Sequence, residues 1–173
     1  MINFVAQKTP MKKLIILLVA FILTICDGNS QNLHFDDCTI VNDIVCVGNK
    51  EYTGLLYGST SNFYIDVRNG HIVSAVAKYP NGNIAFKRVF HSKEKSTDYY
   101  YSKEGNLLME EPSHKGWSKG RRIFRNNGTE IVSGSKEYYD NLEIILKYLR
   151  DNVESIHDKL LSEMRSGIMI ITN

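Results

Sequence analysis

The residues that could serve as metal ligands or catalytic bases are widely spaced. The five histidines are His34, His71, His91, His114 and His157. No two of them lie two or four residues apart and none adjoins a cysteine, so the ligand spacing of a zinc site is missing. His91 precedes Ser92 and His114 follows Ser113, but sequence neighbours seldom form a Ser–His pair, and the glycine-flanked nucleophile turn is lacking. We therefore expect surface histidines.

Two carboxylate pairs, Asp36-Asp37 and Glu110-Glu111, could in principle divide the acid and base roles of glycoside cleavage. Consecutive strand residues point to opposite faces, which keeps Glu110 and Glu111 from converging on one substrate. The stretch Gly116–Gly120 lacks the spacing of a phosphate-binding or dinucleotide-binding loop. The sequence thus predicts no catalytic residue, no cofactor and no metal.

Cys38 and Cys46 flank an apolar stretch with Asn42-Asp43 at its centre. In an oxidising compartment this spacing would let the two thiols meet across a hairpin. We expect a disulfide, which would stabilise the fold by roughly 2–3 kcal/mol, mainly by constraining the unfolded chain.

The aromatic residues are the most suggestive side chains for recognition. Tyr52, Tyr99 and Trp117, with Tyr101 beside them, could line one binding surface, because amphipathic rings are favoured at interfaces. The alternative is that these rings form cross-strand pairs which hold a thin sheet together. Both interpretations are open from the sequence.

The N-terminus has the features of a secretion signal. Lys12-Lys13 precede an apolar run, Leu14–Ile25, which is too short for a membrane span and fits a cleaved signal peptide. We assign residues 1–30 to this signal, with a start at Met11 as an alternative and cleavage before Gln31. A rival interpretation is a lipoprotein signal in which Cys26 carries lipid. We therefore expect export to the periplasm or the exterior, with membrane attachment only through Cys26.

Removal of residues 1–30 leaves 18 basic and 18 acidic residues, so the mature chain has no formal net charge. Nucleic-acid affinity rests on neutralising phosphates with clustered cations. We therefore expect no nucleic-acid partner.

Residues 31–135 alternate short apolar stretches with glycine turns, which predicts an antiparallel hairpin meander. Gly82, Gly105 and Gly128 are each 23 residues apart, and the aromatic residues that precede them are Tyr79, Tyr101 and Phe124. A period of this kind is typical of a repeated supersecondary unit that stacks on its neighbours.

The C-terminal part has a helical period. Apolar residues recur every three or four positions from residue 138 to 164, which predicts one amphipathic helix over residues 136–167, packed on the sheet. Ser135 can cap its start and Gly167 is placed to end it. The apolar tail, residues 168–173, is either a final strand or an exposed end. The expected fold is mainly β with one C-terminal helix.

The segments Glu51–Gly54, Tyr79–Ile84 and Tyr101–Leu107 resemble the MORN-repeat variant found in YwqK-like antitoxin proteins. The resemblance covers roughly residues 48–134 and is weakest in the third copy, around Phe124. It implies a β-hairpin array that binds or scaffolds another protein, without a cofactor or a catalytic centre.

We therefore expect an exported, non-enzymatic binding protein, with an immunity or antitoxin-like role as one version. The alternative is an envelope-associated protein that contacts glycan or membrane.

Overall fold

A computed structural model describes residues 33–167 and 169–171 of the chain. The proposed signal peptide, the alternative start at Met11 and the lipidation candidate Cys26 lie outside the described residues. Among the described residues, none of the helices is both long enough and apolar enough to span a bilayer.

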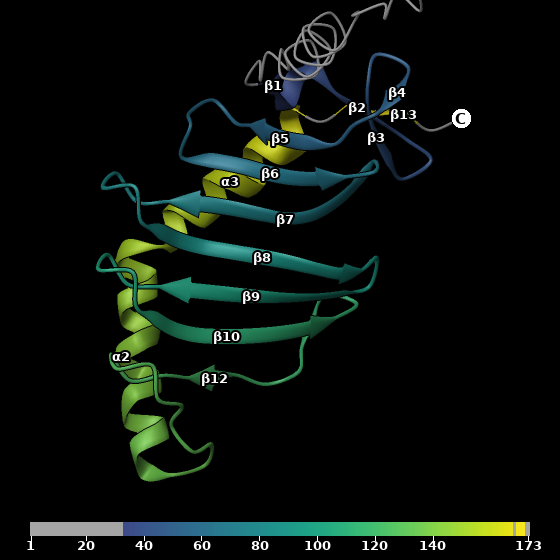
Figure 1. Ribbon diagram of the computed structural model, residues 1–173. Helices are drawn as coiled ribbons and strands as arrows, with labels where there is room; N and C mark the ends of the chain where they lie inside the picture. The colour runs from purple at the N-terminus through teal and green to yellow at the C-terminus, as the bar shows by residue number, and fades with distance from the viewer. Residues whose placement is uncertain (1–32, 168, 172–173) are drawn as a thin grey trace, which may run out of the picture. The chain divides into compact units, whose positions relative to one another are not determined.

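The larger sheet is a meander of antiparallel strands, as the turn signals predicted (Figure 1). Its path is β1 (Leu33–His34), β5 (Gly54–Tyr57), β6 (Phe63–Arg68), β7 (His71–Lys78), β8 (Ile84–Ser92), β9 (Lys95–Tyr101), β10 (Leu107–His114) and β11 (Trp117–Ser118). β12 (Arg122–Ile123) also pairs with β10. Among the described strands of this sheet, β1 and β5 form the one parallel pair. Register shifts interrupt four of the strand pairs, and they decide which side chains share a face.

A smaller sheet joins the two ends of the described chain. It has the order β13 (Met169–Ile171), β2 (Thr39–Val41), β3 (Ile44–Val47), β4 (Lys50–Glu51), and the 3-10 turn η1 (Phe35–Asp37) precedes it. The predicted turn at Asn42-Asp43 is confirmed, because both residues have positive φ, 52° and 65°. β13 pairs in parallel with β2, so the C-terminal tail forms a strand.

The predicted disulfide between Cys38 and Cys46 is wrong, since both thiols are free. The hairpin register places Cys46 opposite Thr39 instead of Cys38. Successive residues of an extended segment point to opposite faces, so the two thiols lie on different sides of the hairpin. The Sγ of Cys38 instead donates to the carbonyl of Phe35 at 3.1 Å.

The C-terminal segment forms α2 (Lys136–Asn152) and α3 (Glu154–Gly167) in place of the single predicted helix. The helical region ends at Gly167, and Ser135 caps its start by accepting a hydrogen bond from the Tyr138 amide at 3.0 Å. The break falls at Val153, whose φ of −120° is not helical. α2 and α3 consequently run in different directions across the sheet (Figure 1).

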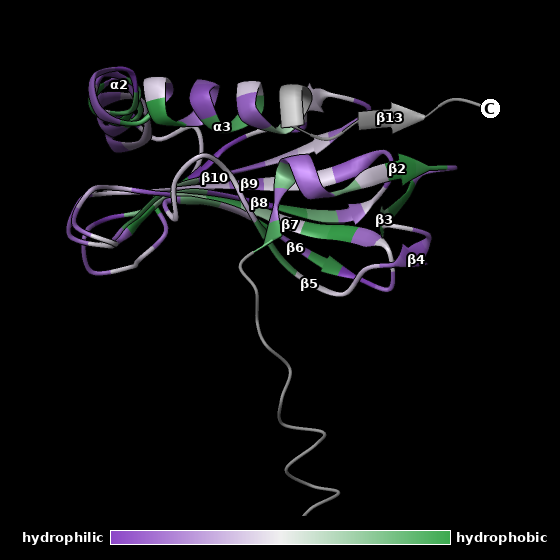
Figure 2. Cartoon of the chain, turned by 90° about the horizontal axis from the view of Figure 1, so that it is seen from above, coloured by the Kyte–Doolittle hydropathy of each residue, from purple (hydrophilic) through white to green (hydrophobic). Residues whose placement is uncertain are grey.

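Both helices lie on one side of the larger sheet (Figure 2). The core lies between the helices and the sheet. On the sheet side it includes one row of residues that are direct cross-strand partners: Phe63, Ala77, Phe86, Tyr100, Met109 and Ile123. The predicted helical stripe packs on these residues: Tyr138, Leu142, Ile145, Leu149, Val153, Ile156, Leu160 and Met164. Burial of apolar side chains between the helices and this row therefore holds the helices on the sheet.

The 23-residue glycine period corresponds to one turn built three times. The amide of Gly82 donates to the carbonyl of Tyr79, and the amide of Tyr79 donates to the carbonyl of Asn83. The same pair of bonds recurs in residues 102–106 and in residues 125–129. Gly82, Gly105 and Gly128 have φ of 89°, 91° and 81°, a region in which glycine is favoured. The glycine prediction is confirmed.

The predicted repeat aromatics do not occupy equivalent positions. Tyr79 opens its turn and is buried, with its hydroxyl donating to the Tyr101 carbonyl at 2.7 Å. The second and third turns begin with Ser102 and Arg125, which make the hydrogen bonds that Tyr79 makes in the first. Tyr101 and Phe124 each lie one residue earlier. The aromatic residue is thus not the fixed element of this repeat, whereas the glycine is.

Candidate functional site

A polar cavity lies on the helix-bearing face of the larger sheet, beyond the part that the helices cover. A second row lies beside the apolar row on the same face, two residues away along each strand. It consists of Ile65, Ala75, Arg88, Asp98 and Glu111. It is apolar on β6 and β7 and charged on β8, β9 and β10. The charged part of this row lines a cavity instead of packing against the helices.

Arg88 and Asp98 form a bidentate ion pair on neighbouring strands. The Nε–Oδ1 and Nη2–Oδ2 distances are 2.6 and 2.7 Å. The side chains are only 27% and 10% exposed, so the pair is poorly screened by solvent. The hydrogen bond to Asp98 raises the pKa of Arg88, against the opposing effect of burial. The two side chains hold each other in place at the base of the cavity.

Glu111 stands directly opposite Asp98 on β10. Two facing carboxylates repel each other. Glu111 is held by Arg121, whose Nε lies 3.2 Å from its Oε1. The row therefore holds one cation followed by two anions, and Arg121 supplies a second cation beside Glu111, so each carboxylate is held by its own arginine.

A third row, on the same face, is made mostly of hydroxyls. Phe90 pairs with Ser96, Ser96 with Ser113, and Ser113 with Ser118. The Oγ atoms of Ser96 and Ser113 lie 2.8 Å apart and share a hydrogen bond. A half-buried aromatic ring is thus followed by a line of serines.

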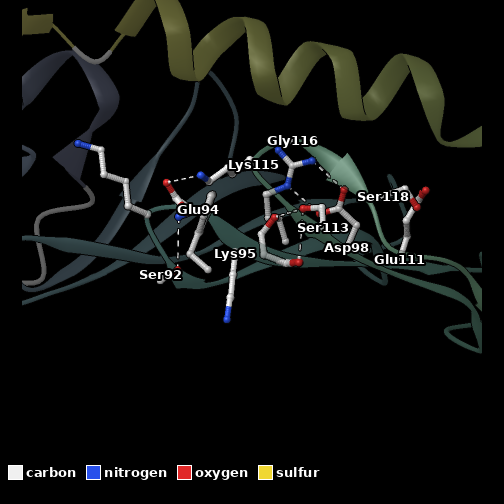
Figure 3. Close-up of a pocket in the computed structure, with 13 residues that line it drawn as sticks. Ser92, Glu94, Lys95, Asp98, Glu111, Ser113, Lys115, Gly116 and Ser118 are labelled. Atoms are coloured by element: carbon white, nitrogen blue, oxygen red, sulfur yellow. Dashed lines mark hydrogen bonds and ion pairs between the residues drawn. The ribbon is translucent and has the colours of Figure 1, made fainter.

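These rows line a half-open cavity of about 600 Å³, which we call the corner cavity (Figure 3). Its rim includes Glu94, whose carboxylate lies 3.6 Å from the Nζ of Lys115 and 3.3 Å from the Nε2 of His114. Lys93 reaches the β2–β3 turn, where its Nζ lies 2.7 Å from Asp43. Lys95 contributes to the wall, but its side chain points away from Asp98 and Ser113 (Figure 3).

A second cavity of about 330 Å³ lies between the sheet and the helices and shares Glu111 with the corner cavity. Its wall includes His157 of α3, whose ring packs on Phe86 with 4.4 Å between centroids. The Nε2 of His157 is buried, and within the described chain it has no hydrogen-bond partner. Burial, assisted by the nearby Arg88, lowers the pKa of His157. The neutral imidazole is therefore favoured.

The opposite face of the larger sheet carries no described helix (Figure 2). We call it the open face. Its central row follows the register Tyr64, Val76, Lys87, Tyr99, Glu110, Arg122. Tyr57 pairs with Tyr64, with ring centroids 6.0 Å apart, and Lys78 lies over the Tyr64 ring at 5.2 Å. This face therefore carries aromatic rings and charges of both signs, with the buried Val76 among them.

The predicted surface of Tyr52, Tyr99 and Trp117 is not brought together. Tyr99 lies in the middle of the open face, whereas Tyr52 precedes β5 and donates from its hydroxyl to the Leu55 carbonyl. Trp117 lies on β11 at the other end of the sheet path and is 75% exposed. β5 is second in the strand order and β11 is last, so Tyr52 and Trp117 lie far apart. The neighbours of Tyr99 are instead Lys87 and Glu110.

The expectation for Glu110 and Glu111 is confirmed. Glu110 faces Arg122 on the open face, whereas Glu111 faces Arg121 on the helix side. Of the histidines, His114 contacts Glu94 at the rim of the corner cavity, whereas the Nε2 of His91 lies 2.9 Å from the Oγ1 of Thr97. Within the residues that the structure describes, no group of three or more His, Cys, Asp or Glu side chains is arranged to hold a metal ion.

The residues of the corner cavity were missed in the sequence. Phe86, Arg88 and Phe90 alternate along one strand, as do Ser96, Asp98 and Tyr100 along the next. This alternation was a readable signal that each set shares a face. The pairing of the two sets could not be predicted, because a register shift between Ser92 and Phe90 offsets them from the register of the adjoining β8–β9 turn.

Comparisons with protein-family models, with curated proteins and with solved structures each gave no match for this chain.

Proposed function

We propose that this chain is an exported, non-enzymatic binding protein that recognises another protein through the open face of its larger sheet. The observation that carries the proposal is the row from Tyr64 to Arg122, in which two tyrosines lie among a buried valine, a lysine, a carboxylate and an arginine. This composition differs from that of the opposite row, which is apolar and is covered by the helices.

The side chains of the open face suit a protein interface. Tyrosine and arginine dominate the binding energy of protein interfaces, because they bury large areas while keeping a polar group for hydrogen bonding. Tyr99 lies between Lys87 and Glu110, so charges of both signs surround its ring. Charges of both signs favour a partner with complementary charges over a uniformly charged polymer.

The helices make this face available as a rigid platform. α2 and α3 pack on the other side of the same strands, which fixes the sheet without covering the open face (Figure 2). Such a platform loses little conformational entropy on binding.

The resemblance to MORN-variant repeats supports the same conclusion. The recurrence of one turn at a period of 23 residues is consistent with a hairpin repeat array. An immunity or antitoxin-like role, in which the partner is a toxin met outside the cytoplasm, is the version that this resemblance favours.

The test is co-purification from the periplasm, followed by binding measurements with the purified partner. We expect Tyr99→Ala to weaken that binding by at least about tenfold, as for interface hot spots. The matched control is Tyr139→Ala, because Tyr139 is 62% exposed on α2, away from the open face. A partner bound equally well by wild type and Tyr99→Ala, or a partner lost only with Tyr139→Ala, would overturn the proposal.

A further inference from the structure

We propose that the corner cavity is a binding site for an uncharged saccharide. The site lies on the helix-bearing face and is separate from the open face, so this inference goes beyond the proposed function. Its volume of about 600 Å³ falls in the range of sites that enclose small ligands.

The charges of the lining favour a neutral ligand. Apart from Lys95, which points away, the cations are Arg88, Lys93 and Lys115 and the anions are Glu94, Asp98 and Glu111. The two signs therefore balance. Each of these groups also has an oppositely charged partner within hydrogen-bond or ion-pair distance. An ion in the cavity would meet charges that are already paired with opposite charges, so the lining offers it little net attraction.

The polar atoms suit a ligand that donates and accepts hydrogen bonds at many points. Each serine hydroxyl can donate one hydrogen bond and accept two, so Ser96 and Ser113 keep free capacity after bonding to each other. Arg88 uses Nε and Nη2 on Asp98, and its Nη1 makes no hydrogen bond within the described chain. Sugar hydroxyls match this mixture of donors and acceptors.

Phe90 supplies the apolar part of the site. It lines the cavity at the start of the hydroxyl row, directly across from Ser96. One face of a sugar ring exposes mainly C–H groups, which pack favourably against an aromatic ring, while the rim of hydroxyls stays free for polar partners. The order of ring, then serines, then paired charges thus matches the two kinds of surface on a saccharide.

Calorimetry provides the direct readout, and Trp117 fluorescence supplements it. Trp117 is the single tryptophan of the chain and adjoins the cavity residues Gly116 and Ser118, but successive strand residues point to opposite faces, so its ring lies on the face opposite to Ser118. The experiment titrates the purified protein with free neutral oligosaccharides of hexoses and of N-acetylhexosamines, and also with a uronic-acid oligosaccharide and inorganic phosphate. Trp117 fluorescence and calorimetry are followed. We expect at least one neutral sugar to bind with a Kd of about 1 mM or tighter in calorimetry.

Variants assign that binding to the cavity. The double variant Ser96→Ala/Ser113→Ala should weaken it about tenfold, since it removes two hydrogen-bonding groups. Phe90→Leu should weaken it as well, while keeping an apolar side chain that supports the fold. Ser133→Ala is the matched control, because Ser133 is exposed and lies in the loop before α2. Thermal melting of each variant shows that it is folded, and Tyr99→Ala should leave sugar affinity unchanged.

Three results would overturn the proposal. The first is that none of the neutral sugars binds. The second is that a sugar binds equally well to wild type and to both cavity variants. The third is binding restricted to the uronic-acid sugar or to phosphate that weakens steeply with salt, which would make the cavity an anion site.

Discussion

Asp98 stands directly between Arg88 and Glu111, its cross-strand neighbours on β8 and β10. Arg88 turns a guanidinium edge to both oxygens of Asp98, while the Glu111 carboxylate is a like charge on the other side. Asp98 is therefore a buried anion whose stability depends on one partner.

We expect Asp98→Asn to destabilise the protein by about 1–3 kcal/mol, because it leaves the half-buried Arg88 without its counter-charge. Chemical denaturation measures this difference. Arg68→Ala is the control, since Arg68 is 70% exposed in its pair with Asp66, and it should cost less than about 0.5 kcal/mol. Equal losses at both positions would contradict the assignment of Arg88–Asp98 as a desolvated pair.

The three repeated turns predict three similar substitution energies. Gly82→Ala, Gly105→Ala and Gly128→Ala should each cost about 1 kcal/mol, because alanine is strained at positive φ although the space around each glycine is open. Substitution by asparagine should cost less at all three sites, since asparagine tolerates this conformation. An alanine variant with unchanged or increased stability would show that its turn has a different backbone geometry. Thermal unfolding of the six variants is the measurement.

The two thiols should differ in reactivity. Burial, followed by the nearby Asp37 and Asp36, raises the pKa of Cys38 to about 11, and the thiolate is the reactive species. In a Cys26→Ser background, iodoacetamide should therefore label Cys46 much faster than Cys38 in the folded protein, as followed by mass spectrometry. In denaturant without reductant, both should be labelled. Failure of both to react there would mean that they are joined as a disulfide.

His157 should make stability depend on pH. Because its pKa is lowered in the folded protein, His157 takes up a proton at a higher pH in the unfolded state than in the folded state as the pH falls. Its contribution is complete above the ordinary value of 6.5 and is lost as the pH falls through the lowered pKa. The groups that influence it are Arg88, Asp98 and Asp158.

Melting temperatures measured between about pH 5 and 8 test this expectation. The rise in stability with pH should be smaller in His157→Gln than in wild type, whatever the overall stability of the variant. His71→Gln is the control, because His71 is exposed at the start of β7, and it should keep the wild-type slope. The same slope in His157→Gln and wild type would rule out His157 as the responsible group.

The sequence predicted those features that depend on local chemistry. The turn glycines need positive φ, and the stripe from Tyr138 to Met164 follows from helical geometry, so both could be placed correctly. The helix break at Val153 was missed because the apolar period continues through it.

Features that depend on strand register could not be predicted from local sequence patterns. Cys38 and Cys46 have a spacing that allows a bridge, but a turn register one residue different turns them to opposite faces. The corner cavity needs Arg88, Asp98 and Glu111 to align across three strands, and register shifts in each of the strand pairs involved set that alignment. Single residues inserted into a ladder leave little trace in composition.

The pairing of β13 with β2 has a consequence for biosynthesis. The edge of β2 that β13 covers belongs to residues 39–41, whereas its cover comes from residues 169–171. During translation the hairpin of β2 and β3 therefore emerges long before the strand that completes its sheet. The nascent chain carries an uncovered strand edge until synthesis is nearly finished, and that interval is when a chaperone would be most useful.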